Sequence, residues 1–131
     1  MVTTVKPFLM FQGDADAAIA LYTAQFPDAR VENLLRHGPE TPAVEGKVAS
    51  ATLTIAGQTV MINDSVVRHA FTFTPSFSFF VTCDDEAELD RLFAGLGEGG
   101  QVYMEPADYG FSRRFTWIGD RFGVSWQLNL P

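Results

Sequence analysis

Residues 117–129 form the stretch of sequence that decides the fold, Trp117-Ile118-Gly119-Asp120-Arg121-Phe122-Gly123-Val124-Ser125-Trp126-Gln127-Leu128-Asn129. Two apolar runs flank a turn that contains glycine and aspartate, which is typical of a β-hairpin. Alternation in the second arm separates apolar from polar side chains. The apolar face holds Val124, Trp126 and Leu128, and the polar face holds Ser125, Gln127 and Asn129. One face is therefore predicted to pack on the core, while the other presents amide and hydroxyl groups.

Outward from this hairpin, the chain is predicted to alternate strands with two helices. Asp14 or Asp16 is predicted to cap the first helix, and Asp84 and Asp85 the second, because a carboxylate accepts the unpaired amide hydrogens of a first turn. The helices are predicted over residues 15–25 and 86–96, and the strands over 6–11, 29–35, 48–55, 59–63, 76–83, 101–104, 113–118 and 123–130. Residues 37–46 and 105–110 are predicted loops.

The order of these elements is strand–helix–strand–strand–strand, twice over, and a weak internal repeat supports it. An offset of 71 places Asp14 on Asp85 and Leu21 on Leu92, and an offset of 66 places Asn63 on Asn129. The fold class is therefore predicted to be α+β, with the helices outside the sheet. One domain is expected over residues 1–131, with a first module at 1–65, a linker at 66–75 and a second module at 76–131.

Composition narrows the possible partners. The chain has 131 residues and a formal net charge of −7, which repels nucleic acid and anionic membranes. Its single cysteine cannot form an internal disulfide, which favours a reducing compartment. The first residues lack the pattern of a signal peptide, and no apolar run is long enough to span a bilayer. A cytoplasmic protein with no nucleic-acid or membrane partner is expected.

Four segments together resemble a known family. They are Pro7-Phe8-Leu9-Met10-Phe11, residues 17–22 leading to Phe26-Pro27, residues 77–81 before Cys83-Asp84-Asp85, and residues 120–127. The chain resembles the PhnB-like (demethylubiquinone methyltransferase-like) branch of the vicinal oxygen chelate superfamily, which also holds glyoxalases and bleomycin-resistance proteins. This resemblance implies two βαβββ modules that form a curved mixed sheet around a cavity, and it implies homodimers.

The resemblance also implies a divalent metal, held by His and Glu side chains from the first and last strand of each module. In this sequence Gln127 stands where the superfamily commonly has its final Glu, and Met61 is its equivalent in the first module. The opening strands offer Pro7 or Phe8, and Ser76, Phe77 or Ser78. None of these side chains is an imidazole or a carboxylate, so no metal and no cofactor are expected at this position.

The methyltransferase part of the family description has little support in the sequence. A nucleoside-containing methyl donor is usually held by a glycine-rich turn between a strand and a helix. The run Gly97-Glu98-Gly99-Gly100 instead follows a predicted helix and precedes a predicted strand.

Several residues are candidates for binding a ligand. Gln127, Ser125 and Asn129 would reach it from the cavity wall. Asn63 is a candidate too, because the internal repeat places it on Asn129. Trp117 would floor an apolar pocket, Arg113 would pair with an anionic group, and a buried Glu105 would serve as a general base. The alternatives are a solvated strand face for the amides, a core position for Trp117, and a surface ion pair between arginine and Glu105 or Asp108.

Three functions remain open from the sequence. The first is a small-molecule-binding protein with a metal-free cavity and an unknown ligand. The second is a metal-dependent lyase, isomerase or dioxygenase that takes ligands from unusual places, such as His37 or His69 entering across a dimer. The third is an interaction protein whose dimer is its function. Cys83 is expected to be a buried, inert thiol, because Asp84 and Asp85 disfavour its thiolate.

Overall fold

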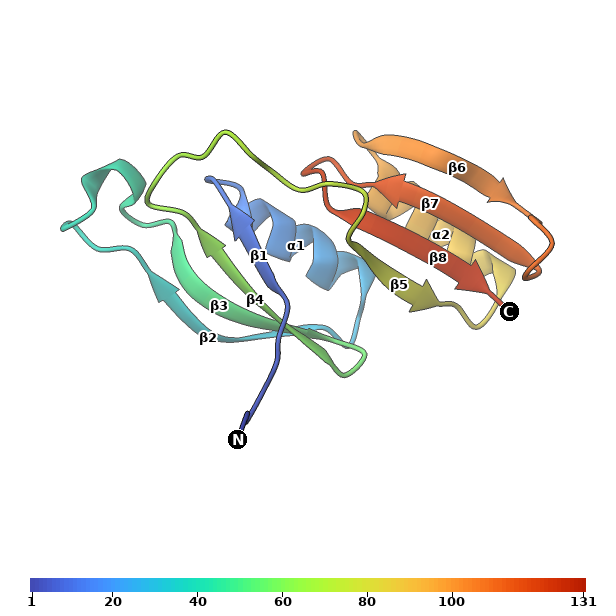
Figure 1. Ribbon diagram of the computed structural model, residues 1–131, viewed down its shortest axis with the longest axis horizontal. Helices are drawn as coiled ribbons and strands as arrows, with labels where there is room; N and C mark the ends of the chain where they lie inside the picture. The colour runs from blue at the N-terminus through green and yellow to red at the C-terminus, as the bar shows by residue number, and fades with distance from the viewer. The chain divides into compact units, whose positions relative to one another are not determined.

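The computed structural model describes residues 1–131 (Figure 1). The chain divides into two compact units, which are unit 1, residues 1–70, and unit 2, residues 71–131. The division falls inside the predicted linker at residues 66–75.

Unit 1 is a four-stranded mixed sheet with one α-helix. Its sheet order is β1-β4-β3-β2, in which β1 runs parallel to β4 and the other neighbours are antiparallel. The elements are β1 (Phe8–Phe11), α1 (Ala15–Gln25), β2 (Arg30–Arg36), the short 3₁₀ helix η1 (Pro42–Val44), β3 (Val48–Ile55) and β4 (Gln58–Asp64). The helix packs on β3 and β4.

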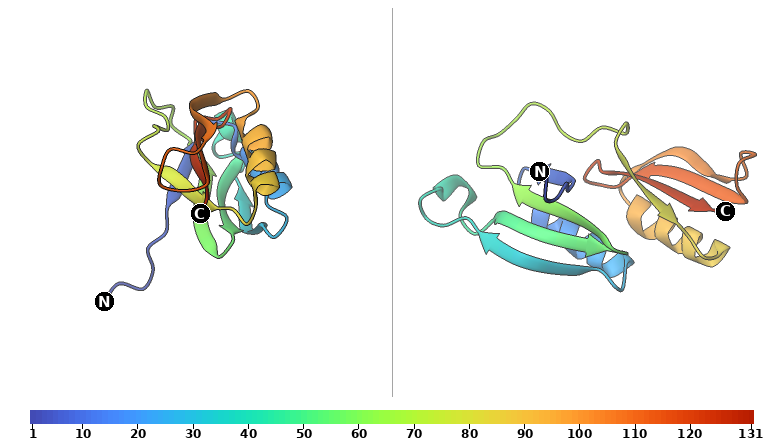
Figure 2. Two further views of the ribbon diagram at one scale, coloured as in Figure 1. Left: turned by 90° about the vertical axis from the view of Figure 1, so that its right-hand side faces the viewer. Right: turned by 60° about the horizontal axis from the view of Figure 1, so that its bottom comes forward.

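Unit 2 repeats the same topology. Its sheet order is β5-β8-β7-β6, again with the first strand parallel to the last. The elements are β5 (Ser78–Thr82), α2 (Glu86–Gly97), β6 (Gln101–Ala107), β7 (Arg114–Gly119) and β8 (Ser125–Leu130). Figure 2 shows each helix lying along one face of its own sheet. The predicted α+β class and the repeated βαβββ order are confirmed.

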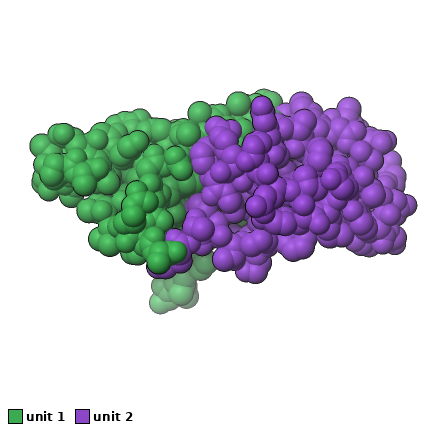
Figure 3. Space-filling view, turned by 90° about the horizontal axis from the view of Figure 1, so that it is seen from above, with its two compact units in different colours: residues 1–70 green, residues 71–131 purple.

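Each unit, shown in space-filling form in Figure 3, has its own core between helix and sheet. The buried residues of α1 are Ala15, Ala18 and Tyr22, and those of α2 are Leu89, Leu92 and Leu96. These buried sets lie 74 residues apart, although the helices begin 71 residues apart. The sequence offset of 71 therefore aligns the helix starts but not the buried faces. Two alanines and a tyrosine are buried from α1, whereas three leucines supply the apolar burial of α2.

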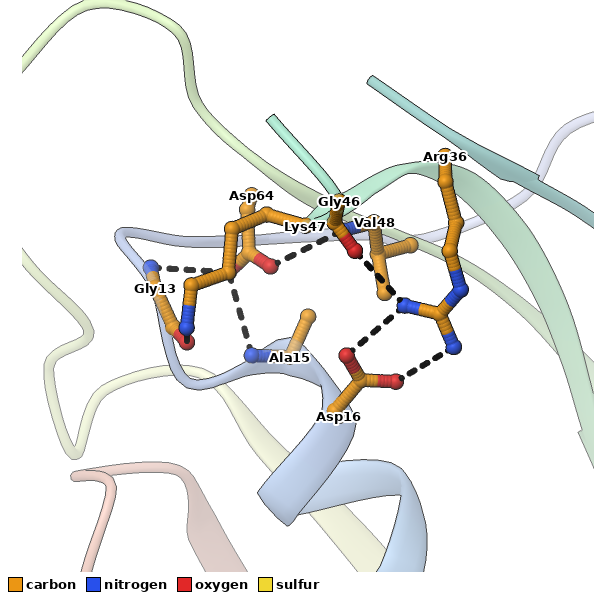
Figure 4. A network of polar contacts seen from close by, with 8 residues as sticks. All are labelled: Gly13, Ala15, Asp16, Arg36, Gly46, Lys47, Val48 and Asp64. Atoms are coloured by element: carbon orange, nitrogen blue, oxygen red, sulfur yellow. Dashed lines mark hydrogen bonds and ion pairs between the residues drawn. The ribbon is translucent and has the colours of Figure 1, made fainter. Parts of the chain in front are cut away.

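The helix caps differ from the prediction in unit 1. Asp14 occupies the N-cap position of α1 but makes no side-chain cap hydrogen bond. Instead, Oδ1 of Asp64 at the end of β4 accepts hydrogen bonds from the backbone N–H groups of Gly13, at 2.8 Å, and Ala15, at 3.0 Å (Figure 4). Asp64 is fully buried, and its Oδ2 also accepts from the Val48 N–H at 3.2 Å. The carboxylate therefore joins the start of the helix to two strands.

The other acidic residues of the helix starts have different partners. Asp16 forms a two-bond ion pair with Arg36, at 2.8 and 3.1 Å, which lowers the pKa of its carboxyl group. In α2 the prediction for Asp85 is confirmed, because its Oδ1 accepts from the Glu88 N–H at 2.8 Å. Glu88 in turn accepts from the Asp84 N–H at 2.9 Å, an exchange similar to a capping box.

Three further details differ from the sequence prediction or extend it. Strand β6 runs to Ala107, so the predicted loop at 105–110 begins as strand.

The β3–β4 hairpin closes through Ala56 and Gly57, whose φ angles of 48° and 84° are those of a type I′ turn. Neither helix is long and apolar enough to cross a membrane.

Candidate functional site

Strand β8 has the two faces that its sequence predicts. Trp126 is 1 % exposed and Leu128 is fully buried, on the side of the sheet that α2 covers. Gln127 and Asn129 are half-buried on the opposite side, which we call the polar face of unit 2. Ser125 belongs to this face too, yet it is only 1 % exposed. The polar face is therefore built into the structure around Ser125 instead of being fully solvated.

The Ser125 hydroxyl is the centre of a hydrogen-bonded network on this face. The Trp117 indole Nε1–H donates to the Ser125 Oγ at 2.8 Å, and the Ser78 Oγ lies 2.6 Å from it. The Gln127 side-chain amide donates to the Ser78 Oγ at 3.3 Å. The Pro75 carbonyl accepts from both hydroxyls, at 3.4 and 3.3 Å. These contacts join β5, β7 and β8 on one surface.

The register of the sheet explains why these side chains meet. Ser78 pairs with Ser125 between β5 and β8, and Trp117 pairs with Gln127 between β7 and β8. Ser125 faces Gly119 on the other side, so the indole of Trp117 has room to reach the serine hydroxyl. Trp117, one of the predicted aromatic candidates, is half-buried here and also packs against Tyr103, with 5.3 Å between ring centroids.

Asn63 and Asn129 occupy equivalent places in the two units. Asn63 pairs with Met10 of β1, and Asn129 pairs with Thr82 of β5. Both side-chain Oδ1 atoms are buried and have no hydrogen-bond partner. A buried acceptor without a partner is uncommon and costs free energy. Each asparagine therefore keeps a polar side-chain oxygen that no other group of the protein satisfies.

The charged candidates lie away from the network. Arg113 is exposed, and its Nε donates to the carbonyl oxygen of Pro131 at 2.5 Å. Glu105 is exposed as well, so it is not the buried carboxylate that a general base at this position would require. Its backbone carbonyl accepts from the Tyr109 hydroxyl at 2.6 Å. Arg113 and Glu105 are not brought together with Gln127 by any contact.

The expected arginine ion pair is also different. Arg114 does not pair with Glu105 or Asp108. It binds Asp90 of α2 at 2.9 Å and lies 3.8 Å from Glu86. This contact ties β7 to the helix, on the side of the sheet away from the polar network.

The donor atoms near the superfamily's metal position do not fit a divalent ion. The register pairs Phe8 with Met61 in unit 1 and Phe80 with Gln127 in unit 2. Phe80 was not among the opening-strand residues expected from the sequence, and it adds no ligand atom. Borderline metals prefer imidazole, thiolate or carboxylate donors. The chain contains no group of three or more His, Cys, Asp and Glu side chains that would hold an ion.

The remaining reactive side chains have structural surroundings. The His37 Nε2 lies 2.9 Å from the backbone oxygen of Asp64, and the His69 backbone N–H donates to the Gln12 side chain at 2.7 Å. Cys83 is a free, buried thiol. Burial, with the charges of Glu88 and Asp84, raises the pKa of Cys83 to about 11. The expected burial of this thiol is confirmed, and burial raises its pKa more than the neighbouring acidic residues do.

Sequence reasoning did not identify Ser78, Tyr103 and Asp120 as parts of this region. Asp120 is buried in the β7–β8 turn, where its Oδ1 accepts from the N–H groups of Phe122 and Val124 and its Oδ2 from the Trp126 indole at 3.0 Å. An aspartate at the start of a glycine-containing turn is a usable signal for such a role. For Tyr103 the sequence offers no comparable signal, because a bulge in β6 sets its position.

The paired βαβββ sheets are the fold of the vicinal oxygen chelate superfamily. Listeria monocytogenes FosX, a fosfomycin resistance protein, shares this fold with a TM-score of 0.67 at 14 % identity, over 98 % of this chain and 94 % of that chain. A family model described as 3-demethylubiquinone-9 3-methyltransferase matches residues 3–129. The chain belongs to this family, the PhnB-like branch of the superfamily.

Two solved structures show the same relationship at higher identity. A Bacillus cereus protein described as a putative 3-demethylubiquinone-9 3-methyltransferase, PhnB protein, is 42 % identical, with a TM-score of 0.93 over 98 % of this chain and 100 % of that chain. The Pseudomonas aeruginosa protein PA1353 is 27 % identical, with a TM-score of 0.84 over 98 % of both chains. The resemblance expected from the sequence is confirmed.

Proposed function

We propose that this protein binds a small molecule on the polar face of unit 2, through Gln127, Asn129 and the network around Ser125. The observation that carries the proposal is the pre-formed set of hydrogen bonds joining Trp117, Ser125, Ser78 and Gln127. Binding sites combine a few fixed polar groups with apolar surroundings. Here the fixed groups lie beside the buried, unpartnered Oδ1 of Asn129 and the ring of Trp117.

The residues at this site favour binding of a small molecule without a metal ion. Phe8 pairs with Met61, and Phe80 with Gln127, where the family resemblance implies the metal ligands would lie, and none of these side chains is an imidazole or a carboxylate. The methyl-transfer activity in the family description also has no evident nucleotide turn, because Gly97–Gly100 leaves a helix and enters β6. The alternative of a metal-dependent lyase, isomerase or dioxygenase therefore has no set of residues in its favour.

Exchanging the equivalent residues of the two units tests the proposal. The variant Gln127→Met gives unit 2 the side chain that unit 1 has at Met61, with little change in volume. Ligands would be found by screening a metabolite mixture with ligand-observed NMR and Trp117 fluorescence. We expect Gln127→Met to weaken binding about 5-fold, since one hydrogen bond to a neutral group contributes about 1 kcal/mol. Met61→Gln is the matched control, and equal affinities for wild type and Gln127→Met would reject the site.

We further propose that the protein is a cytoplasmic homodimer. Phe8 is 52 % exposed and Phe80 is 59 % exposed on the faces opposite the helices, and large exposed apolar side chains often mark an interface. The buried, unpaired Cys83 agrees with a reducing compartment. Analytical ultracentrifugation should give twice the mass of one chain. In Phe80→Ser, the measured mass should fall toward that of a single chain. A monomer at high micromolar concentration would reject the dimer.

A further inference from the structure

A pocket of about 270 Å³ lies under the β7–β8 turn of unit 2. The residues that line it come from the turn between α2 and β6, the start of β6, the β7–β8 turn, and the segment before β5. The residues that matter here are Phe73, Pro75, Gly99, Tyr103, Asp120 and Arg121. The volume is just below the usual range of ligand sites, about 300–1,000 Å³, so the pocket suits a compact molecule or one end of a larger one.

The pocket adjoins the polar face described above. Pro75 lines it, and the carbonyl oxygen of Pro75 accepts hydrogen bonds from Ser125 and Ser78 of the network. Tyr103 lines it as well and packs against Trp117. A ligand seated in the pocket would therefore extend directly onto the polar face, and the inference that follows rests on the proposed function.

Arg121 is an exposed side chain that lines this pocket and has no acidic partner. Its guanidinium carbon lies 4.6 Å from the centroid of the Phe122 ring. Its stem passes close to Gly99, where an added Cβ would come within 3.4 Å of the Arg121 Cβ. Arg121 takes part in none of the ion pairs or side-chain hydrogen bonds of the chain. The planar set of donors of its guanidinium is thus available to a carboxylate.

The neighbouring Asp120 limits the charge that the pocket accepts. Its carboxylate is turned inward, where three N–H groups hold it, so it does not neutralise Arg121 directly. Its negative charge nevertheless opposes a second negative charge on a ligand nearby. A carboxylate carries one charge, whereas a phosphate group carries about 1.5 to 2 negative charges at pH 7. This difference favours a carboxylate.

We propose that Arg121 and the Tyr103 hydroxyl bind the carboxylate of a small monoanionic ligand in this pocket, with its remaining atoms along the polar face. Tyr103 supplies a second donor, because its Oη lies over Gly119, only 2.7 Å from where a Cβ would be. Phe73 and Tyr103 also line the pocket, and their rings would contact the remaining atoms of the ligand.

Benzoate and its neutral isostere benzamide are the probes that test this proposal. Each is titrated into the full-length protein while backbone amide shifts are followed by NMR. We expect benzoate to shift the amides of Gly99, Gly119 and Gly123, with benzamide at least 10-fold weaker and inorganic phosphate about 5-fold weaker. Equal binding of benzoate and benzamide, no shift with either, or tighter binding of phosphate would each overturn the inference.

Two variants assign the effect to the pocket. Arg121→Gln should weaken benzoate about 10-fold and leave benzamide unchanged, while Arg91→Gln on α2 makes the same charge change away from the pocket and should alter neither. Gly119→Ala should displace the Tyr103 hydroxyl and weaken benzoate. Benzoate affinity that is equal in wild type and Arg121→Gln would overturn the assignment. If a screened ligand still depended on Gln127 in that case, the proposed function would stand while this inference failed.

Discussion

The two units of this chain have one topology and two different surfaces. In unit 1, the residues opposite the helix include Phe8, Met61 and a cross-strand pair of threonines, Thr54 and Thr59, whose hydroxyls lie 3.3 Å apart. In unit 2, the corresponding surface holds the network around Ser125. The comparison shows that the topology fixes where a site can lie, while a few side chains on one sheet decide whether it carries polar chemistry.

The units also differ in how a buried aspartate stabilises them. Asp64 in unit 1 binds three backbone N–H groups and joins α1 to its sheet. Asp120 in unit 2 binds two backbone N–H groups and the Trp126 indole, and it fixes the β7–β8 turn. The same residue type therefore secures a helix start in one unit and the edge of the proposed binding region in the other.

Replacing each aspartate by asparagine should produce the largest effects. In Asp64→Asn and Asp120→Asn, the new amide nitrogen must face an N–H donor in place of an oxygen. We expect each variant to lose about 3 kcal/mol of unfolding free energy, since hydrogen bonds to charged groups contribute about 1.5–3 kcal/mol each. Urea unfolding measures the loss.

The exposed Asp16 is the control for this pair. Asp16→Asn removes an ion pair with Arg36 at the surface, where such pairs contribute about 0–1 kcal/mol. A loss below about 1 kcal/mol in either buried variant would show that backbone relaxation replaces the missing acceptor, and the comparison between the two aspartates would then fail.

The next largest effect tests the polar network itself. Ser125→Ala removes the acceptor of the Trp117 indole, and Thr59→Ala removes the hydroxyl at the equivalent place in unit 1. We expect the first to cost about 1.5 kcal/mol, because it leaves a half-buried donor unsatisfied, and the second about 0.5 kcal/mol or less. Trp117 emission should shift only in Ser125→Ala. Equal losses would mean that the two faces do not differ energetically.

Much of this fold was predictable because its signals are local. Alternation in residues 124–129 gave the faces of β8, and the span of α1 was predicted to the residue because a proline follows it closely. The cap of α2 also came from neighbours in the sequence. These features depend on side chains a few positions apart, which a sequence presents directly.

The features that sequence reasoning missed depend on distant residues. The carboxylate that accepts from the first turn of α1 belongs to Asp64, 49 positions after the start of the helix. The sequence predicted Asp14 or Asp16 for this role, because both lie next to the helix start. Ser78 meets Ser125 across 47 positions, through the register of parallel strands. Strand β6 extends through Glu105 to Ala107, beyond its predicted end at residue 104, because it pairs with β7 along this length. Pairing between strands, and not propensity, decides these contacts.

At alkaline pH, the stability of unit 2 should depend on pH in a way that the stability of unit 1 does not. Cys83 follows β5 where the equivalent residue of unit 1 is the buried Phe11, so only unit 2 buries a thiol there. The pKa of Cys83 is raised from 9.0 to about 11 in the folded protein. The stabilisation from the neutral thiol is therefore complete below pH 9 and is lost as the pH rises from 9 to about 11. Unfolding of wild type and Cys83→Ala across this range measures it.

Alkylation of the same thiol gives an independent check. Iodoacetamide should modify folded protein slowly at pH 8 and rapidly once it is unfolded in urea, because the thiolate is the reacting form. Rapid alkylation of the folded protein at pH 8 would contradict the raised pKa and the burial that causes it.

The smallest expected effect concerns the hairpin turns, where one substitution should raise the unfolding free energy instead of lowering it. Unit 2 closes β7–β8 with a turn held by Asp120, whereas unit 1 closes β3–β4 with only Ala56 and Gly57. Ala56 has a φ of 48°, a left-handed conformation that costs a residue with a Cβ about 1–2 kcal/mol and that asparagine tolerates better. Ala56→Asn should therefore raise the unfolding free energy by about 0.5–1 kcal/mol. Gly57→Ala, at a φ of 84° with open space around it, should lower that energy by a similar amount. A neutral result for both would mean that the backbone of this turn relaxes freely, unlike the turn that Asp120 holds.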